Sequence, residues 1–472
     1  MKKKKIRRWI LGVVGGLLLL LLLLQATFLL FGDEILKNSI LLGFRQYSQQ
    51  AFEPGREPEL DFDNLSLNIL TGNLTLEGLY FAGYLPSEEG SGDYLRLSVP
   101  QATVEGLKLL DLYKERSVVL EDINFINPDI QLMKSADDDS LRMAPQESIR
   151  ASTRSLHRLI VPYLRTFSFR KLNVRDGNLF VTQQGEDTTS SNRFLARHVY
   201  IDLNDFLLDS LSLEKTDRIF FTKDFEVRLG DYQILAPDSS FLLRSDTLGY
   251  SSREETIYLK NVRTFPLQQD SLKTNFSLSV PDLYLTEVSW KEIYFDSLFY
   301  ADQLVVEQPM LSLSNHDKAD SLKNQTQFAL KHLSVARLYP LISDKFKELR
   351  VNDLVIRQGR LHMEQVALDT VDLMSIHEVN FLLKGIRLGA GAGLQDSLTS
   401  AFPADTFILD LQDIRMYLPD RRHYLTIANA SLNTSRQQDF VCNVLMDSLN
   451  LKPGYDSLEQ LLSLPPVNPL AF

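Results

Sequence analysis

The amino-acid sequence predicts a mainly β protein, in which an N-terminal transmembrane helix precedes an elongated, tandemly repeated antiparallel β-structure with a few short amphipathic helices. Three observations predict this fold. An uncharged apolar run lies close to the N-terminus, apolar residues alternate with polar ones beyond residue 58, and similar segments recur at a nearly constant spacing.

Composition excludes several classes of protein. The chain has 472 residues, 44% of them hydrophobic, a net charge of −11 and a single cysteine, Cys442. These values exclude a collagen-like chain, a disulfide-stapled miniprotein and a wholly disordered chain. Six of the 50 Lys and Arg residues lie among the first eight residues, and all 61 Asp and Glu residues lie beyond them. Because the bulk of the chain is acidic, no nucleic-acid partner is expected.

The N-terminal run predicts a membrane anchor. Residues 9–31 carry no ionisable side chain, and a helix of 23 residues is long enough to cross a hydrocarbon core about 30 Å thick. The basic residues 1–8 are expected in the cytoplasm, so the rest of the chain is expected on the far side of the membrane. Residues 32–57 are expected to continue as a helix or linker. The alternative interpretation is a cleaved signal peptide, although the run is longer than such segments usually are.

Short alternating runs predict strands along most of the chain. Leu65, Leu67 and Ile69 alternate with Ser66 and Asn68 ahead of a Thr-Gly-Asn turn, which predicts a β-hairpin. Comparable runs follow at residues 94–99, 117–125, 129–133, 171–181, 225–229, 256–259, 276–280 and 304–313. Two stretches, 145–166 and 326–347, have helical spacing, and each contains a proline that should end or kink the helix.

Collinear matches predict an internal duplication. The sequence Leu-Ser-Val-Pro at 97–100 recurs at 278–281, and Pro128 matches Pro309. Further on, LNVRDGNL at 172–179 matches LVIRQGRL at 354–361. We therefore expect a first β-rich unit at residues 58–245, a second at 246–430, and a partial third unit with a C-terminal tail at 431–472. Units that follow one another without Pro/Gly-rich linkers suggest one sheet extended by adding strands.

Apolar residues on these strands are expected to share one face of the sheet. The candidates for a lipid-holding surface are Leu65, Leu67, Leu97, Val99, Val118 and Leu120 in the first unit, and Leu278, Val280, Leu304 and Val306 in the second. A sheet with one apolar face must curl, receive helices, or hold an apolar ligand on that face. The alternative is that these residues form the core of an ordinary β-sandwich.

The N-terminal part of the chain resembles AsmA-like proteins, the group related to TamB. The resemblance is carried by the basic N-terminus, the apolar run, ELDFDNLSLNILTGNLTLEGLYF at 59–81 and LSVPQATVEGLKLLDLYKERSVVLEDINFINPDIQL at 97–132, and it returns over 276–313. It implies a bacterial inner-membrane anchor and a periplasmic, taco-like β-groove lined with apolar side chains. It also implies a part in outer-membrane biogenesis or in moving phospholipid, with envelope proteins at the outer membrane as further partners.

The sequence offers no sign of covalent catalysis, of a cofactor or of a metal site. The nucleophile-elbow, zinc-protease and phosphate-loop patterns are absent, and the seven histidines are scattered without the spacing of metal ligands. We therefore expect a protein that holds or conducts phospholipid acyl chains, which needs no enzyme chemistry. A scaffold or interaction module for outer-membrane protein assembly is the alternative.

Asp-Ser/Thr-Leu occurs nine times, far more often than the composition predicts. The hydroxyl residues are Ser140, Ser210, Thr247, Ser271, Ser297, Ser321, Ser397, Ser448 and Ser457. The tripeptide resembles the O-glycosylation sequon of exported Bacteroidetes proteins, and glycans would add bulk and solubility at exposed turns. An equally good explanation is that Asp-Ser opens a turn and Leu begins the next strand.

Overall fold

A computed structural model describes residues 37–38, 40–42, 44–45, 57–68, 71–84, 94–108, 111, 114–134, 153–154, 156–158, 160–183, 191–215, 217–235, 241–266, 275–315, 346–366, 370–389, 406–417, 423–435 and 438–450. Within these ranges no helix is both long and apolar enough to span a membrane. The basic tail at 1–8 and the apolar run at 9–31 lie outside the described residues. Those described between 37 and 45 are helical, in the stretch where a helix or linker was expected.

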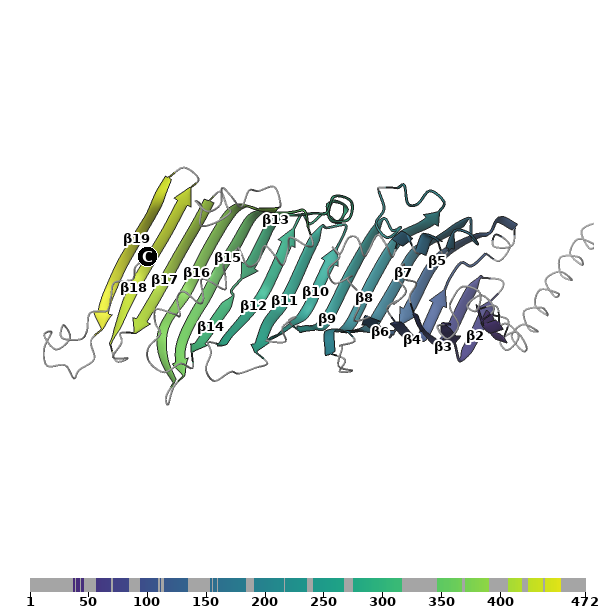
Figure 1. The fold of residues 1–472 in the computed structure, drawn as a ribbon, viewed down its shortest axis with the longest axis horizontal. Coiled ribbons are helices and arrows are strands. Elements are labelled where there is room, and N and C mark those ends of the chain that lie inside the picture. The colour runs from purple at the N-terminus through teal and green to yellow at the C-terminus, as the bar shows by residue number, and fades with distance from the viewer. Residues whose placement is uncertain are drawn as a thin grey trace, which may run out of the picture.

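The described chain folds as one 19-stranded sheet, so the expectation of a mainly β protein is confirmed (Figure 1). The strands are β1 (Glu59–Asp61), β2 (Asn64–Asn68), β3 (Asn73–Tyr84), β4 (Tyr94–Val104), β5 (Ser117–Ile126), β6 (Asp129–Lys134), β7 (Thr166–Gln183), β8 (Ser191–Asp209), β9 (Asp224–Leu235), β10 (Phe241–Ser251), β11 (Thr256–Pro266), β12 (Asn275–Thr286), β13 (Leu298–Glu307), β14 (Met310–Asn315), β15 (Glu348–Val366), β16 (Thr370–Gly389), β17 (Thr406–Tyr417), β18 (Tyr424–Ser435) and β19 (Gln438–Asn450). A π-helical turn, η2, spans Glu292–Asp296.

Most strands pair with the strand that follows them in sequence, and the sheet is elongated, with β19 at one end and the described helical residues between 37 and 45 near the other (Figure 1). Most pairs are antiparallel, but the sheet is mixed, because four pairs are parallel. These four pairs involve two broken strands. β5 and β6 pair in parallel with β7, and β13 and β14 pair in parallel with β15. Parallel neighbours need a long crossover, and the two stretches expected to be helical are these crossovers. Residues 153–165 of the first include helical turns, whereas 316–345 of the second lie outside the described residues.

Each broken strand is interrupted by a residue with positive φ followed by proline. Asn127 has φ of 51° ahead of Pro128, and Gln308 has φ of 49° ahead of Pro309. At both breaks the proline carbonyl accepts a backbone hydrogen bond from the next strand. The Pro128 carbonyl accepts from Asn178 N–H at 2.7 Å, and the Pro309 carbonyl accepts from Arg360 N–H at 2.7 Å. Segments that match in sequence therefore have matching geometry. The sheet itself is continuous, and residues 245 and 246, the expected unit boundary, both lie inside β10.

In many strands the apolar residues on one face are spaced two, three and then two residues apart. We call the three-residue spacing the irregular step. Among the described residues, this step contains a positive-φ residue at Gly78, Asp176, His198, Asp205, Asp231, Asn261, Gln358, Gly385 and Asp413. Glycine tolerates this conformation, and Asp and Asn adopt it more readily than most other residues. The inserted residue resets the two-residue period, so apolar side chains at i, i+2, i+5 and i+7 lie on one face.

The irregular step also shows which residues of the two units correspond. Alternation had named Val118 and Leu120 as candidates in the first unit and Leu304 and Val306 in the second. In the sheet, Val118, Leu120, Ile123 and Phe125 all belong to one apolar cluster, and Phe299, Ala301 and Leu304 belong to another. At the constant spacing of the duplication, the counterparts of Val118 and Leu120 are therefore Phe299 and Ala301. Leu304 and Val306 correspond to Ile123 and Phe125.

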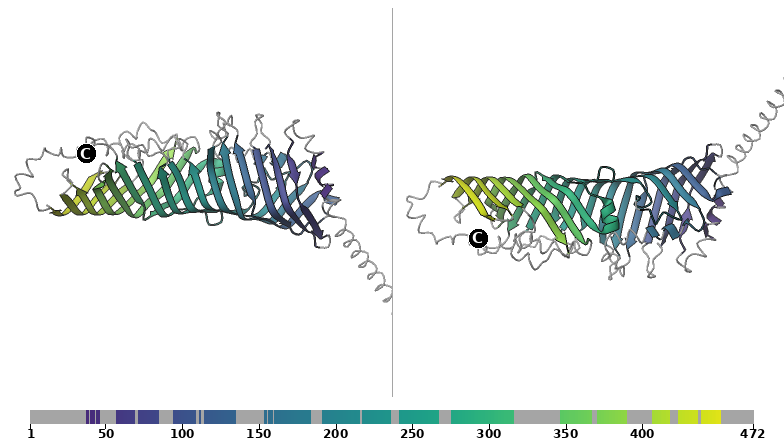
Figure 2. Two further views of the ribbon diagram at one scale, coloured as in Figure 1. Left: turned by 90° about the horizontal axis from the view of Figure 1, so that it is seen from below. Right: turned by 90° about the horizontal axis from the view of Figure 1, so that it is seen from above.

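The two faces of the sheet differ in character. One face, which we call the apolar face, carries the hydrophobic clusters, and the other carries cross-strand polar pairs, such as Arg175 with Asp202 at 3.0 Å and Arg357 with Glu307 at 2.7 Å. The views in Figure 2 show that the long sheet twists and curves along its length, as right-handed strand twist requires.

Candidate functional site: apolar rows across the sheet

Strand registers place apolar residues opposite one another over most of the sheet. One unbroken row, which we call the long row, crosses fourteen strands from β2 to β17. Its members are Leu65, Leu76, Ala102, Phe125, Val174, Ile201, Val227, Tyr250, Ile257, Leu285, Leu304, Leu354, Leu383 and Phe407. Strands are about 4.8 Å apart, so the row is on the order of 60 Å long.

A second row lies beside the long row in the C-terminal part of the sheet. We call it the open row, and it consists of Leu229, Leu248, Leu259, Leu283, Val306, Ile356, Phe381, Leu409, Leu432 and Cys442. The first nine side chains are half-buried and Cys442 is exposed. None is fully covered, although all are hydrophobic or weakly polar. The open row therefore leaves apolar surface accessible along its whole length.

The long row is covered more fully because other segments pack on it. Ile219, from the insert at residues 210–223, joins Phe225 and Tyr250 in a cluster with Trp290 and Tyr294. Near the N-terminal end, Leu41 of the helical residues packs with Leu65 and Leu67, and Phe44 meets Phe81 with ring centroids 6.5 Å apart. These segments cover part of the long row, whereas among the described residues the cluster that contains Leu229, Leu248 and Leu259 is made of strand residues.

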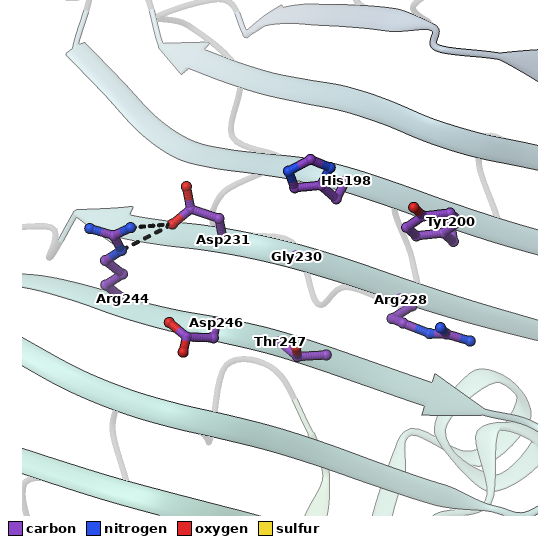
Figure 3. A pocket seen from close by; sticks show the side chains of 8 residues that line it. All are labelled: His198, Tyr200, Arg228, Gly230, Asp231, Arg244, Asp246 and Thr247. Atoms are coloured by element: carbon purple, nitrogen blue, oxygen red, sulfur yellow. Dashed lines mark hydrogen bonds and ion pairs between the residues drawn. The ribbon is translucent and has the colours of Figure 1, made fainter.

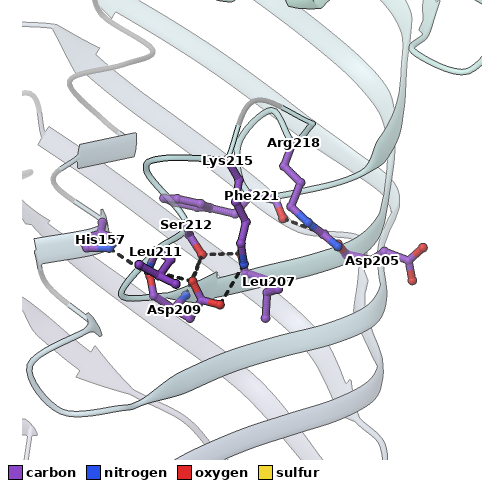
Figure 4. A network of polar contacts seen from close by, with 9 residues as sticks. All are labelled: His157, Asp205, Leu207, Asp209, Leu211, Ser212, Lys215, Arg218 and Phe221. Atoms are coloured by element: carbon purple, nitrogen blue, oxygen red, sulfur yellow. Dashed lines mark hydrogen bonds and ion pairs between the residues drawn. The ribbon is translucent and has the colours of Figure 1, made fainter.

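A polar network fastens the insert at 210–223 to the sheet (Figure 4). The Asp209 carboxylate accepts from Ser212 Oγ at 2.8 Å and from Lys215 Nζ at 2.9 Å, and it also accepts from the Leu211 N–H at 3.0 Å. Burial raises the pKa of Asp209, but the hydrogen bonds from Lys215, Ser212 and Leu211 outweigh burial and leave that pKa below its ordinary value. The Asp209 carbonyl lies 3.0 Å from His157 Nε2, which ties the insert to the first crossover.

The ten candidate residues from the sequence fall into two groups. Leu65, Leu67, Val99, Leu120 and Val280 are buried, with Val99 completely covered, whereas Leu97, Val118, Leu278, Leu304 and Val306 are half-buried. Leu65 and Leu304 belong to the long row, and Val306 belongs to the open row. Sequence reasoning missed the remaining open-row residues because strict alternation loses the phase at each irregular step. Apolar spacing of two, three and two residues is the signal that could have found them.

The opposite face carries a polar hollow of about 410 Å³ over β8, β9 and β10 (Figure 3). Its charged groups already pair with each other or with neighbours. Arg244 donates to Asp231 at 2.7 Å, Asp246 accepts from Asn261 at 2.8 Å, and His198 Nδ1 lies 2.6 Å from Asp176. Since these groups satisfy one another across the strands, they stabilise the irregular steps and leave little free charge for a ligand.

The described residues contain no group of three or more His, Cys, Asp or Glu side chains placed to hold a metal ion. The hydroxyl residues of the Asp-Ser/Thr-Leu tripeptides occupy different settings. Ser210 is exposed in the turn after β8, Thr247 lines the polar hollow, Ser297 has positive φ after η2, and Ser448 lies in β19. Ser140, Ser271, Ser321, Ser397 and Ser457 lie outside the described residues.

No protein-family model matches the sequence, and the comparison with curated proteins gives no match either. A comparison with solved structures finds the C-terminal domain of a sex pheromone precursor from Staphylococcus aureus, at 7% identity and a TM-score of 0.13. That alignment covers 63% of this chain and 66% of the other. A likeness this slight carries no argument about fold or function.

Proposed function

We propose that the chain is an inner-membrane-anchored periplasmic protein of cell-envelope biogenesis, which holds or conducts phospholipid acyl chains along its apolar face. The observation that supports the proposal is the open row, a line of side chains across ten neighbouring strands, of which nine are apolar and half-buried and the last, Cys442, is exposed. The resemblance to AsmA-like proteins at residues 59–132 points the same way.

The mechanism is physical. An acyl chain that leaves water gains about 0.8 kcal/mol for each buried CH₂ group. Open-row residues repeat at the strand spacing of about 4.8 Å, so a chain that advances by one strand exchanges one apolar contact for a similar one. Because successive positions are nearly equivalent, movement along the row meets only small free-energy steps. A groove that bound one position much more tightly than the others would trap the lipid.

Photo-crosslinking tests the proposal directly. A photoreactive amino acid at Leu259 or Val306, both in the open row, should capture phospholipid when the full-length protein is irradiated in native membranes. The matched control is Lys260, which neighbours Leu259 on the same strand and is exposed on the opposite face. Capture at Lys260 equal to that at Leu259, or capture of protein alone at both open-row positions, would contradict the proposal.

The alternative function, a scaffold for outer-membrane protein assembly, has its own supporting observation. Val99 and Val305 have no exposed surface, and Leu65 is 1% exposed, so parts of the sheet are packed as tightly as an ordinary protein core. A scaffold would need rigidity and partner-binding edges but no lipid. Mass spectrometry of lipids that co-purify with the detergent-extracted protein separates the two, because a scaffold would retain no stoichiometric phospholipid.

A further inference from the structure

The open row begins part-way along the sheet. Its first member, Leu229, lies on β9 and packs against a cluster that contains Val199 of β8, and Val199 is only 1% exposed. The long row reaches further towards the N-terminal end, but its members Leu65, Ala102 and Val174 are buried. An acyl chain that comes from the N-terminal end of the sheet therefore needs another path to the open row.

A third line of apolar residues lies on the same face, within three residues of the strand ends, and we call it the rim row. Directly paired residues connect it across β4, β6, β7, β8, β9 and β10, and paired residues share a face of the sheet. Its members are Leu95, Leu132, Val181, Phe194, Ile234 and Leu243. Ile234 is 40% exposed and the others are half-buried, so the rim row leaves apolar surface accessible on strands where the long row is mostly covered.

The rim row begins beside the described helical residues between 37 and 45. Leu95 lies two residues from Leu97 on β4, and Leu97 pairs directly with Phe81 of β3. The Phe81 ring in turn packs against Phe44, one of those helical residues. The expected membrane anchor at 9–31 precedes them closely in sequence. The rim row thus starts at the end of the sheet that would lie nearest the membrane.

The rim row and the open row lie side by side on β9 and β10. On β9, Leu229 and Ile234 flank Tyr232, which is buried. Leu229 and Leu248 of the open row and Leu243 of the rim row all pack against the buried cluster that contains Tyr232. Among the described residues this cluster is made of strand residues, so the two rows adjoin each other without a covering insert there.

The next strand, β11, ends the apolar run of the rim row. Thr264 is the direct partner of Leu243, and it is polar and only 8% exposed. Its hydroxyl accepts a hydrogen bond from the Leu278 N–H at 2.8 Å. On the same strand the open row offers Leu259, which is half-buried. An acyl chain that continues beyond β10 therefore finds accessible apolar surface on the open row and a covered, polar position on the rim row.

Since the proposed function places acyl chains on the open row, we propose that these chains reach it along the rim row and cross between the two rows on β9 and β10. The rim row supplies accessible apolar side chains from β4 to β10, and the open row supplies them from β9 to β18. Their overlap makes one path along almost the whole sheet. The crossing replaces apolar contacts by others of the same kind, so the chain stays out of water throughout.

Photo-crosslinking at Leu132 of the rim row tests the path in the full-length protein in native membranes. A photoreactive amino acid there should capture phospholipid. The matched control is Gln131, which neighbours Leu132 on β6 and lies on the opposite face, and it should capture none. Leu259 reports whether the open row holds lipid at all. Capture at Leu259 without capture at Leu132 would overturn the rim row as the path and leave the proposed function standing, whereas capture at neither would contradict both.

Ile234→Glu tests whether the rim row feeds the open row. Ile234 is partly exposed, so the fold should accept glutamate, but an acyl chain that passes over this position would have to bury a charge. Capture at Leu432, far along the open row, should fall by about tenfold or more, and capture at Leu132 should persist. Gln233→Glu, one residue away on the opposite face, is the matched control and should leave both unchanged. Undiminished capture at Leu432 in Ile234→Glu would show that lipid reaches the open row by another path and would overturn the proposal.

Discussion

Pro128 packs directly against Gly177 on the neighbouring strand. A Cβ atom on Gly177 would lie 2.9 Å from Pro128 Cγ and 3.1 Å from the Pro128 carbonyl oxygen. The second unit repeats the contact, where a Cβ on Gly359 would lie 3.3 Å from Pro309 Cγ. The broken strand of each unit can therefore pass close to the next strand only because glycine stands opposite the proline.

Gly177→Ala should destabilise the protein because the added methyl group meets the proline ring and its carbonyl. We expect a loss of about 1 to 3 kcal/mol, which is typical of overpacking. Thermal unfolding of the full-length protein followed by circular dichroism measures the change. Gly359→Ala is the matched control and should cost less, since its closest contacts begin at 3.2 Å. Equal losses in the two variants would contradict this account.

The sequence repeat marked both residues of this contact, but it did not predict that they touch. Pro128 with Pro309, and Gly177 with Gly359, stood out as matched pairs because both units need the same close approach. Strand content and the repeat could be predicted from alternation and collinear matches. The irregular steps could not be placed, because a polar residue such as Asp231 or Asn261 within a strand looks like any solvent-facing residue until its φ is known.

The irregular step in β17 can be tested at Asp413, which has φ of 51° and is exposed. Asp413→Val should destabilise the protein by about 1 to 2 kcal/mol, because a β-branched residue is strained at positive φ. Asp413→Gly should be tolerated, since glycine adopts this conformation without a steric cost. Urea unfolding of both variants compares them. If valine is tolerated as well as glycine, backbone conformation does not determine the residue at this step.

The candidate site was only partly predictable for the same reason. Apolar alternation in the sequence identified Val306, which lies in the open row. Its neighbours in that row, Leu283 and Ile356, were identified only from the pairing of the strands. Register depends on hydrogen bonds between strands that are distant in sequence, and those leave no local signature. The segments that cover the long row could not be predicted either. Ile219 and Phe221 lie in a segment that has neither the two-residue period of a strand nor the spacing of a helix.

The Asp209 network should make the insert at 210–223 sensitive to acid. The folded state holds the pKa of Asp209 below its ordinary value of about 3.9, so the carboxylate contributes stability above that pH and loses it as pH falls through the lowered pKa. Asp209→Asn should cost about 1 kcal/mol at neutral pH. The difference in melting temperature between wild type and variant should shrink below about pH 4. A difference that stays constant down to pH 2 would rule out the carboxylate as its source.

Lipid retention should depend on the open row and not on the opposite, polar face of the sheet. Leu259→Gln places an amide in the middle of the row, where it must give up hydrogen bonds to water whenever an acyl chain covers it. Burying an unpaired amide costs about 1 to 3 kcal/mol, so retention should fall by roughly one order of magnitude or more. The measurement is the molar ratio of phospholipid to protein after detergent extraction. Lys260→Gln introduces the same side chain one residue away on the exposed face and should leave that ratio unchanged. Equal ratios for Leu259→Gln and wild type would show that acyl chains do not lie on this row.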